Sequence, residues 1–230
     1  RDGFLQKALP GVLGYHIGVQ WLPDGHHLLQ WSSQLIRIVD LEGTVKHELN
    51  LSRTEFQELP VHPKPMVLAV HPNDGSVLVG ASGERLRRWD PVTDEFEFFS
   101  EYEFPAAPCF VYEHLSWSPD GESLIAIQGE SSTLFRRDGR QLAKVDEMIA
   151  FASWSPNSRF LVGGNLKIYR ADNLEFVRQL ELEKGDPCLH ASWGPPVFAP
   201  FWNESDEIVF LSKIREIGSA TGLIGEIRRF

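Results

Sequence analysis

The segment Ser116-Trp117-Ser118-Pro119-Asp120-Gly121 decides the fold, because variants of it recur along the chain. In each variant a large apolar residue, typical of a strand end, is followed by residues that favour a tight turn. Proline and glycine supply the backbone angles of such a turn, and aspartate can hydrogen-bond its own backbone there. The segment therefore predicts the end of one β-strand and the start of a hairpin.

Four other segments repeat this pattern, the last of them with the loosest agreement. They read Val19-Gln20-Trp21-Leu22-Pro23-Asp24-Gly25, Ala69-Val70-His71-Pro72-Asn73-Asp74-Gly75, Ser153-Trp154-Ser155-Pro156-Asn157-Ser158 and Phe201-Trp202-Asn203-Glu204-Ser205-Asp206. The anchors Trp21, Val70, Trp117, Trp154 and Trp202 lie between 37 and 49 residues apart. This spacing brackets the ~40–45 residues of a four-stranded propeller blade. We expect Trp21, Trp117 and Trp154 to be buried between sheets.

The residues after each turn continue the same register. An apolar residue opens a second strand in every repeat, at Leu28, Leu78, Leu124, Leu161 and Val209. Alternating third strands such as Leu35–Asp40 and polar turns follow, and these are strand and hairpin signals. The sequence predicts one all-β domain over residues 1–230 with almost no helix. Its four-stranded antiparallel blades are expected at approximately 11–50, 61–101, 107–146, 148–182 and 188–230, and Ile214–Phe230 is expected to supply the last fourth strand.

These repeats, together with Arg88-Trp89-Asp90, resemble the WD-repeat β-propeller family and its relatives with WSPDG-type repeats. The resemblance covers roughly residues 14–230 and implies a closed five-bladed ring or part of a larger propeller. It also implies a non-catalytic scaffold for protein–protein interaction. The chain departs from the family. Only the second repeat carries Trp-Asp at the end of its third strand, and the Gly-His pair usually found before the first strand is missing from every repeat. We therefore expect mainly apolar packing between blades.

Charge and composition narrow the classes of partner. The formal net charge of −10 repels phosphate backbones, so we expect no nucleic-acid partner. No run approaches the about eighteen apolar residues of a transmembrane helix, so no membrane insertion is expected. Cys109 and Cys188 lack metal-ligand spacing and are expected to be free thiols. Free thiols favour a cytoplasmic location, with a secreted or periplasmic one as the alternative.

Catalytic chemistry is not indicated. The expected innermost strands end at the five anchors, and Glu113 is the only carboxylate in them. A glycosidase needs two carboxylates, and a calcium site needs several oxygen ligands. Phosphate-binding loops, HExxH and GxSxG motifs do not occur. We therefore expect no enzyme activity, metal or cofactor. The alternatives are a propeller enzyme or small-ligand receptor with its site in the central channel, and a periplasmic propeller that binds a partner.

The candidate binding face lies where the connections between blades enter the innermost strands. Ser52–Lys64 and Glu183–Pro196 are long and contain prolines, which lower the ordering cost of a loop on binding. Aromatic residues are enriched at binding hot spots. The candidate protein-binding residues on this face are Tyr15, His16, His62, Tyr112, His114, His190 and Trp193.

A second candidate surface is the segment Asp94–Phe104, in which five carboxylates alternate with five aromatic residues. It is expected to form the outermost strand of the second blade and the start of the loop after it. The simpler interpretation is a strand with one packed face and one charged face that protects the sheet edge.

Overall fold

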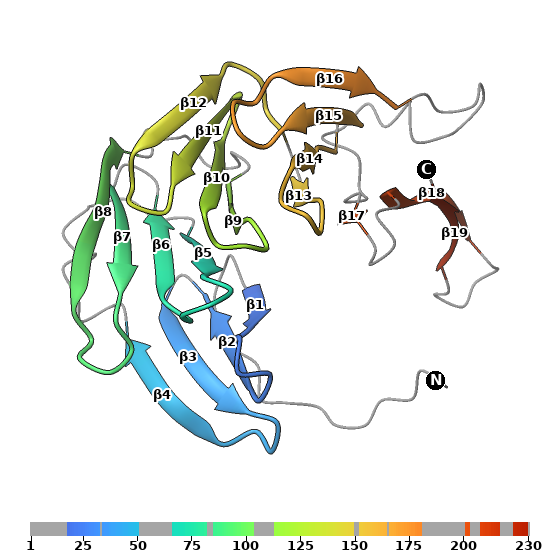
Figure 1. The fold of residues 1–230 in the computed structure, drawn as a ribbon. Helices are drawn as coiled ribbons and strands as arrows, with labels where there is room; N and C mark the ends of the chain where they lie inside the picture. Colours follow the sequence, from blue (N-terminus) through green and yellow to red (C-terminus); the bar gives the residue numbers. More distant parts are fainter. Residues whose placement is uncertain are drawn as a thin grey trace. The chain divides into compact units, whose positions relative to one another are not determined.

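The structure is a computed structural model that describes residues 18–32, 34–50, 66–81, 85–103, 113–149, 152–164, 166–180, 201–202, 208–216 and 223–229. Within these ranges the chain forms β-strands and turns and no helix (Figure 1). None of the described residues belongs to a helix that is long and apolar enough to cross a membrane. The predicted all-β class and the near absence of helix are confirmed for this part of the chain.

The chain divides into two compact units, Arg1–Leu115 and Ser116–Phe230. The first unit holds two antiparallel sheets whose strands follow each other in sequence order. One sheet contains β1 (Gly18–Trp21), β2 (His27–Trp31), β3 (Leu35–Asp40) and β4 (Val45–Asn50). The other contains β5 (Met66–Val70), β6 (Val77–Ala81), β7 (Arg85–Trp89) and β8 (Phe96–Glu103).

The boundary to the second unit falls within the first strand of the third sheet. This sheet contains β9 (Glu113–Trp117), β10 (Ser123–Gln128), β11 (Ser131–Arg136) and β12 (Gln141–Val145). The fourth contains β13 (Ser153–Trp154), β14 (Phe160–Val162), β15 (Lys167–Arg170) and β16 (Phe176–Gln179). The predicted four-stranded antiparallel unit is confirmed in these four sheets.

The fifth sheet differs from the prediction. Its described strands are β17 (Phe201–Trp202), β18 (Ile208–Glu216) and β19 (Leu223–Arg229), in that order. The pairing of β18 with β19 runs from Val209 opposite Arg229 to Glu216 opposite Leu223. Because β18 is continuous over Ile208–Glu216 and pairs with β19 from Val209 to Glu216, no turn divides that segment into two strands. The expectation of a separate fourth strand from Ile214–Phe230 is therefore wrong among the described residues.

The recurrent turn has a clear physical basis in the third and fourth sheets. The buried Ser118 hydroxyl donates to Asp120 Oδ1 at 2.6 Å and accepts from the Ser123 amide at 3.0 Å. Ser155 repeats this arrangement, with its Oγ 2.9 Å from Asn157 Oδ1 and accepting from the Phe160 amide at 2.9 Å. One serine thus satisfies a backbone donor and holds the turn that starts the second strand.

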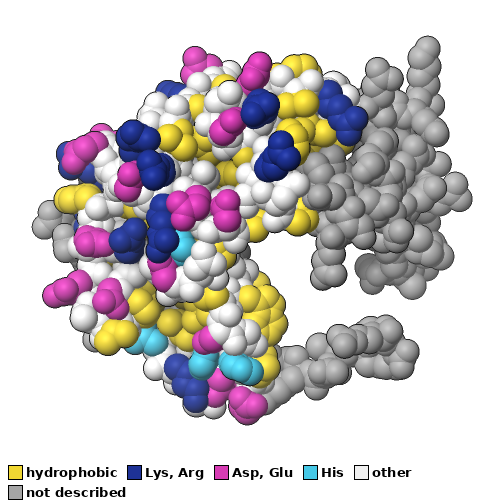
Figure 2. Space-filling model, in the orientation of Figure 1, with side chains coloured by type: hydrophobic (Ala, Val, Ile, Leu, Met, Phe, Trp, Pro, Cys, Tyr) yellow, Lys and Arg dark blue, Asp and Glu magenta, His cyan; other side chains and the backbone are white. Residues whose placement is uncertain are grey.

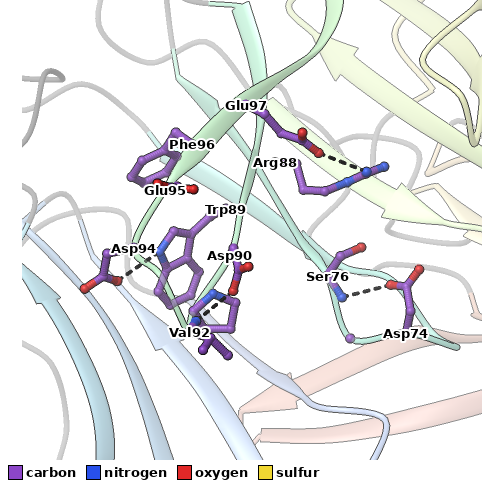
Figure 3. A pocket seen from close by; sticks show the side chains of 12 residues that line it. Asp74, Ser76, Arg88, Trp89, Asp90, Val92, Asp94, Glu95, Phe96 and Glu97 are labelled. Carbon is purple, nitrogen blue, oxygen red and sulfur yellow. Dashed lines mark hydrogen bonds and ion pairs between the residues drawn. The ribbon is translucent and has the colours of Figure 1, made fainter.

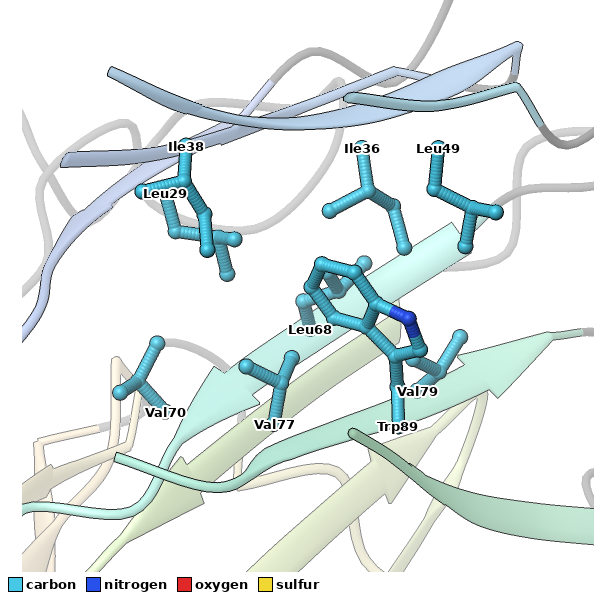
Figure 4. Close-up of a cluster of buried hydrophobic side chains, with 9 residues drawn as sticks. All are labelled: Leu29, Ile36, Ile38, Leu49, Leu68, Val70, Val77, Val79 and Trp89. Carbon is cyan, nitrogen blue, oxygen red and sulfur yellow. The ribbon is translucent and has the colours of Figure 1, made fainter. Parts of the chain in front are cut away.

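The core of the first unit lies between its two sheets. Side chains from both sheets meet in one cluster, which consists of Leu29, Ile36, Ile38, Leu49, Leu68, Val70, Val77, Val79 and Trp89 (Figure 4). All are at most 9 % exposed. Burial of this apolar area supplies the main attraction between the sheets, at roughly 25 cal/mol per Å². The expected apolar packing between neighbouring sheets is present in this unit.

The anchor residues differ in burial. Trp117 and Trp154 are 8 % and 7 % exposed, as predicted, but Trp21 is 55 % exposed, so its predicted burial is wrong. Two anchors contact the sheet that precedes their own within the same unit. Val70 packs against the first sheet, and Trp154 Nε1 donates to the Ser116 carbonyl of the third sheet at 3.3 Å. Trp21 belongs to the first sheet, and no described sheet precedes it in the chain.

Candidate functional site

The predicted binding face falls almost entirely outside the described residues. His114 is described, and its partly buried side chain lies near the start of β9. Tyr15, His16, His62, Tyr112, His190 and Trp193 lie outside, as do the connections Ser52–Lys64 and Glu183–Pro196. The structure therefore does not test whether these residues meet, and the face stays a prediction.

The described part of the second sheet contains a cavity of about 840 Å³ that sequence reasoning missed (Figure 3). The β5–β6 turn, the end of β7, the β7–β8 turn and the start of β8 line it. The lining residues are Asp74, Gly75, Ser76, Arg88, Trp89, Asp90, Pro91, Val92, Asp94, Glu95, Phe96 and Glu97.

The position of this cavity follows from the antiparallel order of the sheet. Consecutive strands reverse direction, so the β5–β6 and β7–β8 turns lie at one end of the sheet. The β6–β7 turn and the connection that enters β5 belong to the opposite end. The predicted binding face uses such entering connections, so the cavity and the predicted face lie at opposite ends of this sheet.

A buried indole and a carboxylate form one wall of the cavity. Trp89 is fully buried, and its Nε1 donates to Asp94 Oδ1 at 3.3 Å. The same oxygen lies 2.8 Å from Nε2 of His47, which is on β4 of the first sheet. The His47 and Trp89 ring centroids are 5.5 Å apart. Asp94 therefore connects the turn of the second sheet to the outer strand of the first.

Backbone hydrogen bonds hold the β7–β8 turn in one conformation. The Asp90 amide donates to the Glu95 carbonyl at 3.0 Å, and the Asp94 amide donates to the Asp90 carbonyl at 2.9 Å. The Val92 amide donates to Asp90 Oδ1 at 2.7 Å. Asp94 has φ of 59°, a left-handed conformation that aspartate adopts more readily than most residues. These bonds define the backbone conformation from which the turn presents its side chains.

The lining is predominantly acidic. It contains five carboxylates and one cation, Arg88, whose Nη1 lies 3.1 Å from Glu97 Oε1. Asp90 and Glu95 have no cation within 4.0 Å among the described residues. Val92 adds an apolar side chain that is 88 % exposed. The arrangement offers hydrogen-bond acceptors and negative charge beside apolar surface.

The acidic–aromatic segment of β8 follows the simpler interpretation from the sequence. Acidic and basic side chains lie next to each other on this part of the surface (Figure 2). Glu101 and Glu103 on β8 pair with Arg85 on β7, with N–O distances of 3.0 and 3.7 Å. Phe99 is buried, whereas Phe98 is 58 % exposed.

The exposed ring of Phe98 is covered in part by two arginines. The guanidinium carbons of Arg85 and Arg87 each lie 5.1 Å from its centroid. Together with the ion pairs of Glu101 and Glu103, these contacts give exposed side chains of β8 structural partners on β7. The alternation in the sequence is therefore explained by pairing within the sheet.

The described residues contain no group of three or more His, Cys, Asp or Glu side chains placed to hold a metal ion. In comparisons with known proteins, no family model and no curated protein matches the chain. The resemblance to WD repeats therefore rests on the residues quoted above alone.

Proposed function

We propose that the chain is a WD-repeat-like β-propeller of five blades, closed into a ring or part of a larger propeller, that serves as a non-catalytic scaffold for a protein or peptide partner. The observation that carries the proposal is the contrast between two kinds of connection. Turns within the first four sheets are two to six residues long, whereas seven to 21 residues join consecutive sheets. Short turns build a rigid support, and long connections on such a support commonly bind partners.

All long connections leave the same end of their sheets. In each four-stranded antiparallel meander, the connection to the next sheet starts at the end that carries the turn between the second and third strands. The connecting segments contain Tyr112 and Trp193, aromatic side chains of the kind enriched at binding hot spots. The proposed partner site is therefore at this end of the sheets.

The absence of paired carboxylates from the first strands supports a non-catalytic role. β1, β5, β9, β13 and β17 are the first strands of their sheets, and across their described residues Glu113 is the only carboxylate. In a propeller these strands surround the central channel, where hydrolysis would require at least a pair of carboxylates or a metal-ligand set. The negative net charge of −10 favours a protein partner over a nucleic acid.

The test begins with crosslinking capture of a partner by the intact chain, followed by affinity measurements with the purified partner. We expect Tyr112→Ala and Trp193→Ala each to weaken binding about tenfold or more, the effect of removing a hot-spot side chain. Phe176→Ala is the control, because Phe176 is an exposed ring on the outer strand β16. Unchanged affinity in both variants, with binding abolished by Phe98→Ala, would place the site on the outer strand β8 instead.

A further inference from the structure

We propose that the cavity at the β5–β6 and β7–β8 turns of the second sheet binds an arginine side chain of a basic peptide. This site is separate from the partner site proposed above and lies at the opposite end of the sheet. Its volume of about 840 Å³ is within the ~300–1,000 Å³ of sites that enclose small ligands. It is therefore large enough for a guanidinium group and part of the chain that carries it.

The first argument is charge that the protein itself does not compensate. The Glu97 carboxylate forms an ion pair with Arg88, and the Asp94 carboxylate contacts the His47 and Trp89 rings. Asp90 and Glu95 remain without a cation among the described residues. One oxygen of Asp90 accepts from the Val92 amide, which leaves Oδ2 for a ligand. A planar guanidinium can donate two parallel hydrogen bonds to such carboxylates.

The second argument is the apolar surface beside those carboxylates. Val92 is 88 % exposed at the cavity, and Pro91 and Phe96 also line it. In Figure 3, Asp90 lies between Trp89 and the Asp74–Ser76 turn, with Val92 close by. The methylene groups of an arginine can cover apolar side chains while its charged end reaches a carboxylate. A bare metal ion would leave this apolar surface exposed, so the lining favours an organic cation.

The fourth sheet provides a matched comparison within the same chain. Its β15–β16 turn has the same backbone bonds, from the Arg170 amide to the Glu175 carbonyl and from the Leu174 amide to the Arg170 carbonyl. Leu174, with φ of 58°, stands at the position of Asp94. In this turn Arg170 Nη2 lies 3.2 Å from Asp172 Oδ2. A guanidinium of the chain itself therefore compensates the charge of this carboxylate. The two turns thus have the same backbone hydrogen bonds, but only the turn of the second sheet has carboxylates without a neighbouring cation among the described residues.

The experiment measures binding of fluorescent hexa-arginine to the intact chain in 150 mM salt, with hexa-citrulline as the uncharged analogue. We expect binding of hexa-arginine only, with perturbation of the Trp89 indole N–H signal in NMR spectra. Glu95→Lys should weaken binding at least tenfold. Glu175→Lys makes the same charge change at the corresponding position of the fourth sheet and should alter affinity less than twofold.

Equal losses in Glu95→Lys and Glu175→Lys would overturn the proposal, because they would show attraction to the net negative charge alone. Perturbed signals confined to residues away from the second sheet would overturn it as well. Val92→Ser provides an independent variant that leaves the charge unchanged, since this exposed residue contributes little to folding. It should weaken binding by loss of apolar contact, and an unchanged or increased affinity would contradict the role of the apolar surface.

The two proposed sites can fail separately. Tyr112→Ala and Trp193→Ala should leave hexa-arginine binding unchanged, because their segments join sheets at the other end. Loss of arginine binding in Glu95→Lys with normal binding of a captured partner would support the arginine site and leave the partner site intact. Loss of both activities in Glu95→Lys would contradict the separation of the two sites.

Discussion

Nε2 of His47 lies 2.8 Å from Oδ1 of Asp94, and this contact joins the outer strand of the first sheet to the β7–β8 turn of the second. The same oxygen accepts from Trp89 Nε1, which places one carboxylate between two aromatic rings. Apolar packing attracts the two sheets, but it has no preferred direction. The polar contact adds directionality, because a hydrogen bond requires a defined distance and angle.

Asp94→Ala should lower the free energy of unfolding by roughly 1–3 kcal/mol. It removes two hydrogen bonds of about 0.5–1.5 kcal/mol each and leaves alanine in a left-handed conformation. Asp94→Asn should cost less than about 1 kcal/mol, because asparagine keeps an acceptor oxygen and tolerates this conformation. Urea denaturation of the three proteins measures the difference. Equal losses in both variants would mean that charge, rather than hydrogen-bond geometry, maintains the contact.

Trp154→Ala should destabilise the protein by roughly 3–5 kcal/mol, the cost of deleting a core aromatic side chain. Trp154→Phe should cost less, since it keeps most of the apolar area and loses the hydrogen bond to the Ser116 carbonyl. Trp21→Ala is the matched control at the same register and should cost less than about 1 kcal/mol because Trp21 is 55 % exposed. A large loss in Trp21→Ala would show that another segment covers this ring in solution.

Ser158 has a strained, left-handed backbone conformation, and its side chain accepts a hydrogen bond from a neighbouring turn. Its φ of 58° resembles those of Gly25, Gly75 and Gly121 at the same place in their turns. Its Oγ accepts from the Asp120 amide at 3.1 Å. Ser158→Gly should change stability by less than about 0.5 kcal/mol, because relief of strain and loss of the bond are both near 1 kcal/mol.

Ser158→Ala should cost about 1 kcal/mol, since it loses the hydrogen bond and keeps the strain. Thermal denaturation of the two variants side by side tests the order of stability. An alanine variant that is as stable as the glycine variant would show that the left-handed conformation carries no penalty at this turn.

Two aspartates of the first sheet should make stability fall in acid. Backbone hydrogen bonding from His26, followed by the His27 side chain, lowers the pKa of Asp24 to about 2. The Lys46 ammonium, at 2.8 Å, lowers the pKa of Asp40 to about 2. A depressed pKa in the folded state stabilises the protein above the unfolded value of about 3.9. That contribution is lost as the pH falls toward 2.

The measurement compares the native chain with the double variant Asp24→Asn/Asp40→Asn in urea denaturation between pH 6 and pH 2. We expect the native chain to be more stable at pH 6 and the difference to shrink as the pH falls. Asp138→Asn is a control for the loss of one exposed carboxylate. A difference that does not depend on pH would show that these two carboxylates have ordinary pKa values.

The turn segments illustrate what local sequence can predict. Ser118-Pro119-Asp120-Gly121 forms its turn through contacts within six residues, so the motif alone predicted it. Asp94 is different, because its partner His47 is 47 residues away in the chain. The cavity beside Asp94 was missed for the same reason: it is built from two turns that only the pairing of β5 to β8 brings to one end of the sheet.

The sequence by itself determined the class of fold, the repeating unit and the chemistry of its turns, because strand alternation and turn preference act over a few neighbouring residues. Tertiary structure alone decided which anchors are buried, as Trp21 and Trp154 show. It also decided that β18 pairs with β19 from Val209 to Glu216 and that His47 contacts Asp94. These outcomes depend on which sheet faces which, and burial and long-range hydrogen bonds exist only after the sheets have packed.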